Sequence, residues 1–192
     1  MKKLVLASRS PYRSELLQKL KIAFLTCSSD IDESAKPSES GEQLAIRLAI
    51  AKAEAVAKKH PNHLIIGSDQ VAVHRHKQLC KPGNRENALR QLTEQSGHAV
   101  KFHTGLCVLD SASGKYLTAL DTCTVYFKKL SVNQIQHYID REQPYDCAGS
   151  FKSEGLGIAL FEKIDSEDPN ALIGLPLIKL VNLLEQFDYP VL

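Results

Sequence analysis

Short apolar runs alternate with stretches of helical spacing in the first third of the chain. Residues 4–7 form an apolar run that is typical of a buried strand. Ser10 and Pro11 then give a cap residue followed by proline at the first helical position, which predicts a helix from Pro11 to about Leu20. Residues 23–28 are expected to form a second strand, and residues 29–40, rich in Asp, Glu, Ser and Pro, an acidic surface loop.

A second helix and a second buried strand follow this loop. Ser40 and Gln43 make a capping box, so a helix should run to about Lys59. Residues 64–66 are an apolar strand that leads into Gly-Ser-Asp-Gln-Val. We therefore expect Asp69 at or near a strand end, a common place for a catalytic carboxylate.

The remaining pattern indicates a hairpin and three further helices. Two strands at 100–109 and 116–128 should be antiparallel, because a polar turn over residues 111–114 joins them. The other expected elements are helices at 84–95, 131–140 and 176–187 and a strand at 157–164. The order predicts an α/β fold: a mixed twisted sheet with flanking helices, within one domain over residues 1–192.

Composition narrows the class of protein. The 192 residues carry 24 basic and 22 acidic side chains, a net charge of +2, with no basic tail, which argues against polymeric nucleic acid as a partner. No stretch approaches the ~20 apolar residues of a membrane helix. The five cysteines are odd in number and form no C-x-x-C pair, so neither a zinc site nor a disulfide framework is indicated, and a reducing cytoplasm is the expected compartment.

The turn from the first strand into the first helix is a candidate anion site. Ser8 and Arg13 flank a helix N-terminus, where amide groups and guanidinium groups favour a phosphate. The alternative is an ordinary capped helix with solvated arginines, and the pattern taken alone favours that alternative.

Four carboxylates are candidates for holding a hard divalent cation. Mg²⁺ takes one or two protein carboxylates together with phosphate oxygens and water, so Glu33 with Asp69 would suffice. Asp69 could also orient or deprotonate the attacking water. Asp30 and Asp32 lie on the same loop as Glu33, and solvation is the simpler interpretation for both.

Lysines and a glycine-punctuated segment complete the candidates. Lys52 and Lys81 could each neutralise phosphate charge, although a solvated lysine is the simpler interpretation of either residue alone. Residues 147–155 could line a ligand pocket or form a plain connecting loop.

Taken in order, these motifs resemble the Maf family of nucleotide pyrophosphatases, and the resemblance covers essentially the whole chain. The shared segments are residues 6–13, 32–33, 47–49 with 52–53, 67–70, 81–82, 148–155 and 170–176.

The resemblance implies a two-lobed α/β fold around a central cleft. It also implies a Mg²⁺ or Mn²⁺ requirement and cleavage between the α and β phosphates of a nucleoside triphosphate. The roles it implies are Asp69 as proton acceptor or metal ligand, Glu33 as its metal partner, and Ser8, Arg13, Lys52 and Lys81 around the phosphates. A homodimer is the assembly it suggests.

Within the family, the chain is most similar to the 7-methyl-GTP branch. Tyr12, Gln70 and Glu154 are then the expected specificity residues. The methylated guanine is cationic, so an aromatic face and a carboxylate suit it. Two alternatives stay open: a dTTP/UTP pyrophosphatase, which would share the phosphate and metal residues, and a non-catalytic nucleotide-binding division regulator.

Overall fold

The computed structural model describes residues 2–192, which form two compact units. Of the described residues, unit 1 comprises 2–70, 104–121 and 168–192, and unit 2 comprises Val71–His103 and Thr122–Glu167. Three strands, β3 (His63–His74), β5 (Ala99–Asp110) and β6 (Tyr116–Phe127), contribute residues to both units.

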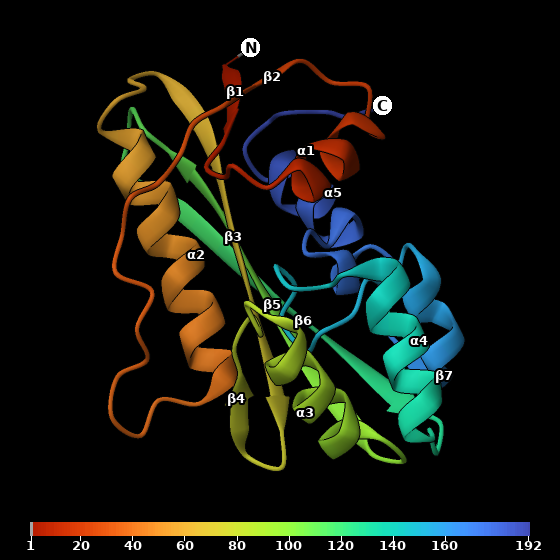
Figure 1. The fold of residues 1–192 in the computed structure, drawn as a ribbon. Coiled ribbons are helices and arrows are strands. Elements are labelled where there is room, and N and C mark those ends of the chain that lie inside the picture. The colour runs from red at the N-terminus through yellow and green to blue at the C-terminus, as the bar shows by residue number, and fades with distance from the viewer. Residues whose placement is uncertain (1) are drawn as a thin grey trace. The chain divides into compact units, whose positions relative to one another are not determined.

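Unit 1 is built on a mixed sheet with the strand order β2-β1-β3-β5-β6. Strand β1 (Lys3–Leu6) pairs in parallel with β2 (Phe24–Thr26) and with β3. The helices of this unit are α1 (Pro11–Gln18), α2 (Gly41–Ala57) and α5 (Leu177–Glu185), with a short 3-10 helix, η2 (Ala171–Ile173). Helix α2 precedes β3 in the chain, and α1 lies beside α5 (Figure 1).

Both faces of this sheet are buried, because successive strand residues point to opposite sides. Leu4 and Leu6 of β1 join a core cluster with residues of α1 and α5, whereas Val5 joins a second cluster with residues of α2. Strand β3 divides in the same way, with Leu64 and Ile66 in the first cluster and Ile65 in the second. The sheet is therefore sandwiched between α2 and the α1–α5 pair.

Two glycines allow α2 to lie directly against the sheet. A Cβ atom on Gly67 would stand 2.1 Å from the carbonyl oxygen of Ala49, and one on Gly105 would stand 2.3 Å from that of Ala45. Neither distance is compatible with a side chain. The helix backbone is thus held close to β3 and β5 at these two points.

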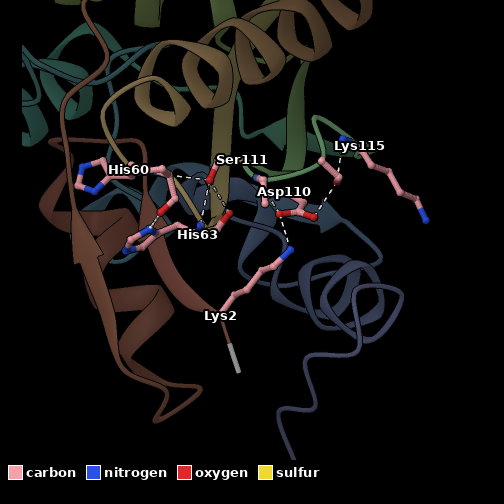
Figure 2. A network of polar contacts seen from close by, with 9 residues as sticks. Lys2, His60, His63, Asp110, Ser111 and Lys115 are labelled. Atoms are coloured by element: carbon pink, nitrogen blue, oxygen red, sulfur yellow. Dashed lines mark hydrogen bonds and ion pairs between the residues drawn. The ribbon is translucent and has the colours of Figure 1, made fainter.

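Polar contacts connect three neighbouring strands at one end, where β1 and β3 begin and β5 ends (Figure 2). The hydroxyl of Ser111 accepts from the backbone amide of His63 at 2.9 Å and donates to the carbonyl of His60 at 2.7 Å. The Lys2 ammonium lies 2.6 Å from Asp110 Oδ1. These bonds join the start of β1 and β3 to the end of β5.

Unit 2 contains the other ends of β3, β5 and β6, with β4 (Lys77–Leu79) and β7 (Phe161–Asp165) at the edges. Its helices are α3 (Arg85–Gln95), α4 (Val132–Glu142) and a 3-10 helix, η1 (Leu156–Leu160). Four phenylalanines pack edge to face in its core, namely Phe102, Phe127, Phe151 and Phe161.

The predicted α/β fold with a mixed sheet is confirmed, and each expected helix is present. Two local predictions were wrong. Asp69 does not lie near a strand end, because β3 continues to His74. Residues 156–160 form a 3-10 helix and the strand begins only at Phe161. The cleft and the assignment of residues 1–192 to one domain stay predictions. Within residues 2–192, no helix is long and apolar enough to cross a membrane.

Candidate active site

Asp69 and Lys52 form the centre of the candidate site in unit 1. Asp69 lies two residues after Gly67 and so points to the same face of β3, toward α2. The Lys52 ammonium lies 2.5 Å from Asp69 Oδ1, and both side chains are about nine-tenths buried. The close approach of α2 at Gly67 therefore brings a lysine of the helix onto a carboxylate of the strand.

Glu33 joins this pair from the acidic loop. Its Oε1 atom lies 2.7 Å from the same Lys52 nitrogen, and its side chain is 58% exposed. One ammonium thus bonds both carboxylates that the sequence singled out. The structure brings together three predicted site residues from β3, α2 and the loop between β2 and α2.

Arg13 approaches the same group from α1. Desolvation lowers the pKa of its guanidinium, although the residue as a whole is only half-buried, and the negative charges of Asp69 and Glu33 oppose that shift. Its Nε atom donates to the carbonyl oxygen of Gly174 at 2.8 Å. The loop before α5 therefore orients Arg13, and its guanidinium interacts electrostatically with the Asp69 and Glu33 carboxylates.

Ser8 and Tyr12 lie where the first strand turns into α1. Ser8 is buried, and its hydroxyl accepts from the backbone amide of Ser10 at 3.1 Å, which leaves its own O–H proton able to donate to an anion. Ser10 caps α1 by accepting from the backbone amide of Arg13 at 3.4 Å. Tyr12, half-buried, occupies the second helical position.

Arg47 anchors the loop that carries Glu33. It lies in one of the family motifs, but the sequence alone indicated no function for it. Its guanidinium bonds both oxygens of Glu39, at 2.6 and 2.8 Å, and donates to the carbonyl of Ser34 at 2.9 Å. These bonds lower the pKa of Glu39 to about 2. Because Ser34 directly follows Glu33, the arginine restricts where the Glu33 carboxylate can go.

Ser68 and Gln70 point to the opposite face of β3 from Asp69. The Gln70 amide nitrogen donates to Thr104 Oγ1 at 3.0 Å and to the carbonyls of Ala171 and Leu172 at 2.9 and 3.0 Å. Ser68 Oγ lies 3.1 Å from the Gly174 carbonyl. An amide nitrogen has two protons, so Gln70 has no donor left for a nucleobase and can meet one only through its oxygen.

Lys81 and Glu154 belong to unit 2. Lys81 is exposed in the loop between β4 and α3, next to buried Pro82. Glu154 is exposed in the turn before η1, where its Oε2 atom accepts from the Ser153 hydroxyl at 3.2 Å. Their predicted roles, toward phosphate and toward the base respectively, stay predictions.

The carboxylate pair fits the donor set that Mg²⁺ or Mn²⁺ takes. Hard divalent cations bind carboxylate oxygens, and two such oxygens already converge on one cationic centre, the Lys52 ammonium. In residues 2–192, no three His, Cys, Asp or Glu side chains are grouped so that they could hold a metal ion. The assignment of Glu33 and Asp69 as metal ligands stays a prediction.

Comparison with known proteins assigns the family. The family model described as Maf-like protein matches residues 3–187. The chain belongs to the Maf family. This Maf protein is 54% identical to a 7-methyl-GTP pyrophosphatase of Nitrosococcus oceani, over 98% of this chain and 95% of the relative. It is 52% identical to a 7-methyl-GTP pyrophosphatase of Colwellia psychrerythraea, over 100% of this chain and 96% of the relative.

A third relative of this Maf protein has the same description. The 7-methyl-GTP pyrophosphatase of Pseudomonas aeruginosa is 50% identical, over 96% of both chains. The family prediction made from ordered motifs is confirmed by these matches.

Proposed function

We propose that this Maf protein hydrolyses 7-methyl-GTP to 7-methyl-GMP and diphosphate. The support for the activity is the similarity to relatives described as 7-methyl-GTP pyrophosphatases, at 50–54% identity over nearly the whole chain. The single structural observation that carries it is the ion-paired group of Glu33, Lys52 and Asp69, with the Arg13 charge nearby. Opposite charges in one place suit a polyphosphate and a cation together.

In this proposal the residues of unit 1 act on the phosphates and on water. Arg13 and the Ser8 hydroxyl bind phosphate oxygens, and Lys52 neutralises charge that develops on the leaving diphosphate. Asp69 accepts the proton of the attacking water on a carboxylate oxygen. Lys81 is proposed as a further phosphate ligand.

Glu33 and Asp69 would hold a divalent cation, Mg²⁺ or Mn²⁺. When bound, that ion polarises phosphate oxygens and offsets the charge of the triphosphate.

The preference for the methylated base is assigned to Tyr12, Gln70 and Glu154. Methylation makes the guanine ring cationic, so stacking on Tyr12 is worth roughly 1–2 kcal/mol when the contact is desolvated. A carboxylate such as Glu154 can accept both guanine N–H groups, which discriminates by roughly 1–3 kcal/mol against a pyrimidine. Gln70 acts here through its oxygen or by holding residues 171–172 in place.

Substrate profiling tests the proposal. Pyrophosphate release is measured for 7-methyl-GTP, GTP, dTTP and UTP with Mg²⁺ or Mn²⁺, and we expect 7-methyl-GTP to be turned over fastest. Glu154→Gln should reduce the preference for 7-methyl-GTP more than the rate on other nucleotides. A rate of pyrophosphate release from dTTP comparable to that from 7-methyl-GTP would instead assign the chain to the dTTP/UTP alternative. No pyrophosphate release from any of the four nucleotides would refute the proposed activity.

A further inference from the structure

Lys52 stands at the position that a divalent cation would share between Glu33 and Asp69. Its Nζ atom is 2.5 Å from Asp69 Oδ1 and 2.7 Å from Glu33 Oε1. An ammonium and a metal ion are both cations that bind carboxylate oxygens at short range, so both cannot occupy the point between these two oxygens.

We infer that Lys52 is a resident substitute for the divalent cation, which holds Glu33 and Asp69 together in the nucleotide-free protein and competes with metal for them. The inference rests on the proposed metal-dependent function and extends it, because it predicts when the metal can bind.

The charge of the group supports competition. Arg13 and Lys52 contribute two positive charges, and Glu33 and Asp69 contribute two negative charges, so the group is neutral without metal. Addition of a divalent ion alone would leave two uncompensated positive charges in a region where Lys52 and Asp69 are about nine-tenths buried. A nucleoside triphosphate carries the negative charge that removes this excess.

The side chain of Lys52 can make the exchange. A lysine ends in a point charge on a flexible four-carbon stem, so its ammonium can move to a phosphate oxygen without movement of α2. The nucleotide-free protein should therefore bind metal weakly, and metal should bind tightly only with the nucleotide.

Metal binding without turnover tests this inference. Free Mn²⁺ is measured by electron paramagnetic resonance during titration of the full-length, nucleotide-free protein. We expect Lys52→Met to bind Mn²⁺ about ten-fold more tightly than wild type or better, because the competing ammonium is gone. Lys52→Arg should remain as weak as wild type, since it keeps the positive charge.

Lys58→Met is the matched control. Lys58 is the exposed C-cap residue of the same helix, so this variant removes the same charge outside the site and should leave Mn²⁺ affinity unchanged. Equal Mn²⁺ affinity of wild type and Lys52→Met would overturn the inference. An equal gain in Lys58→Met would also overturn it, because the effect would then be one of net charge.

A measurement on the wild type covers the case in which Lys52→Met does not fold. Protein labelled with ¹⁵N-lysine should show the ion-paired Lys52 ammonium as a protected resonance, and saturating Mg²⁺ should broaden or shift it. An unchanged resonance at saturating Mg²⁺ would contradict competition. Failure of the proposed function is a separate result, since it appears as absent pyrophosphate release from 7-methyl-GTP by wild type.

Discussion

Gly67→Ala tests whether the contact between α2 and β3 positions Lys52 against Asp69. The new Cβ atom would lie 2.1 Å from the Ala49 carbonyl oxygen and 3.0 Å from the Ala53 Cβ. A comfortable carbon–oxygen contact is roughly 3.2–3.4 Å, so α2 must move away by about 1 Å. Lys52 lies between these two alanines in the sequence, so its backbone moves away from Asp69 by about the same distance, and the 2.5 Å bond to Asp69 is kept only if the side chain leaves its present rotamer.

The expected result is a large loss of rate with a moderate loss of stability. A displacement of about 1 Å at a catalytic group costs on the order of 100-fold in turnover, and overpacking costs about 1–3 kcal/mol of unfolding free energy. Turnover is measured as pyrophosphate release from 7-methyl-GTP, and stability by urea unfolding.

Gly114→Ala supplies the control for stability alone. Gly114 has φ +75° in the open turn of the β5–β6 hairpin, and a Cβ atom there would meet no other atom within 4 Å. Alanine at this position therefore costs roughly 1–2 kcal/mol through backbone strain only. Its turnover should stay close to that of wild type. The reasoning fails if Gly67→Ala retains wild-type turnover, or if both variants lose turnover equally.

Three further outcomes follow from the residues that support the site. Arg47→Met should release the loop beside Glu33 and raise KM for the nucleotide about ten-fold, and a KM equal to that of wild type would show that the loop needs no anchor. The pKa of Glu39 is lowered from 4.5 to about 2, so its contribution to the free energy of unfolding is complete above pH 4.5 and lost as pH falls through about 2. Thermal unfolding recorded against pH checks this: in Arg47→Met, the melting temperature should fall less between pH 4.5 and 2 than in wild type. Gly174 has φ +121°, and a Cβ atom added there would lie 3.3 Å from Arg13 Nε. Gly174→Ala should therefore displace Arg13 and raise KM more than it lowers kcat in steady-state assays. An unchanged KM would show that Gly174 has no part in phosphate binding.

Local signals in the sequence were sufficient for most of the elements. The capping boxes that begin at Ser40 and Ser131 are both formed, and the helices begin at the next residue in each case. The extent of β3 could not be seen in the same way, because the strand continues through Gly-Ser-Asp-Gln as a segment of weak β propensity. Pairing with neighbouring strands, which no single-sequence pattern reports, extends it to His74.

The candidate site was predictable as a set of residue types and less so as a set of contacts. Carboxylates and basic residues in ordered motifs identified Glu33, Lys52 and Asp69, and these three do converge. That Lys52 would bond both acids was not foreseen, because the interpretation assigned the acids to metal and the lysine to phosphate. Lys52 contacts both of the carboxylates that the sequence interpretation assigned to the metal.

Strand periodicity explains why Asp69 and its neighbours Ser68 and Gln70 point to opposite faces of β3. Odd-numbered residues of this part of β3 face α2, which puts Asp69 above Gly67, and even-numbered ones face the other way, which puts Ser68 and Gln70 against residues 171–174. This alternation follows from the sequence once the strand is known. The partners on the second face come from about 100 residues further along the chain, and only the folded structure supplies them. Substitutions at Ser68 and Gln70 should therefore act on the loop that orients Arg13, while substitutions at Asp69 act on the chemistry itself.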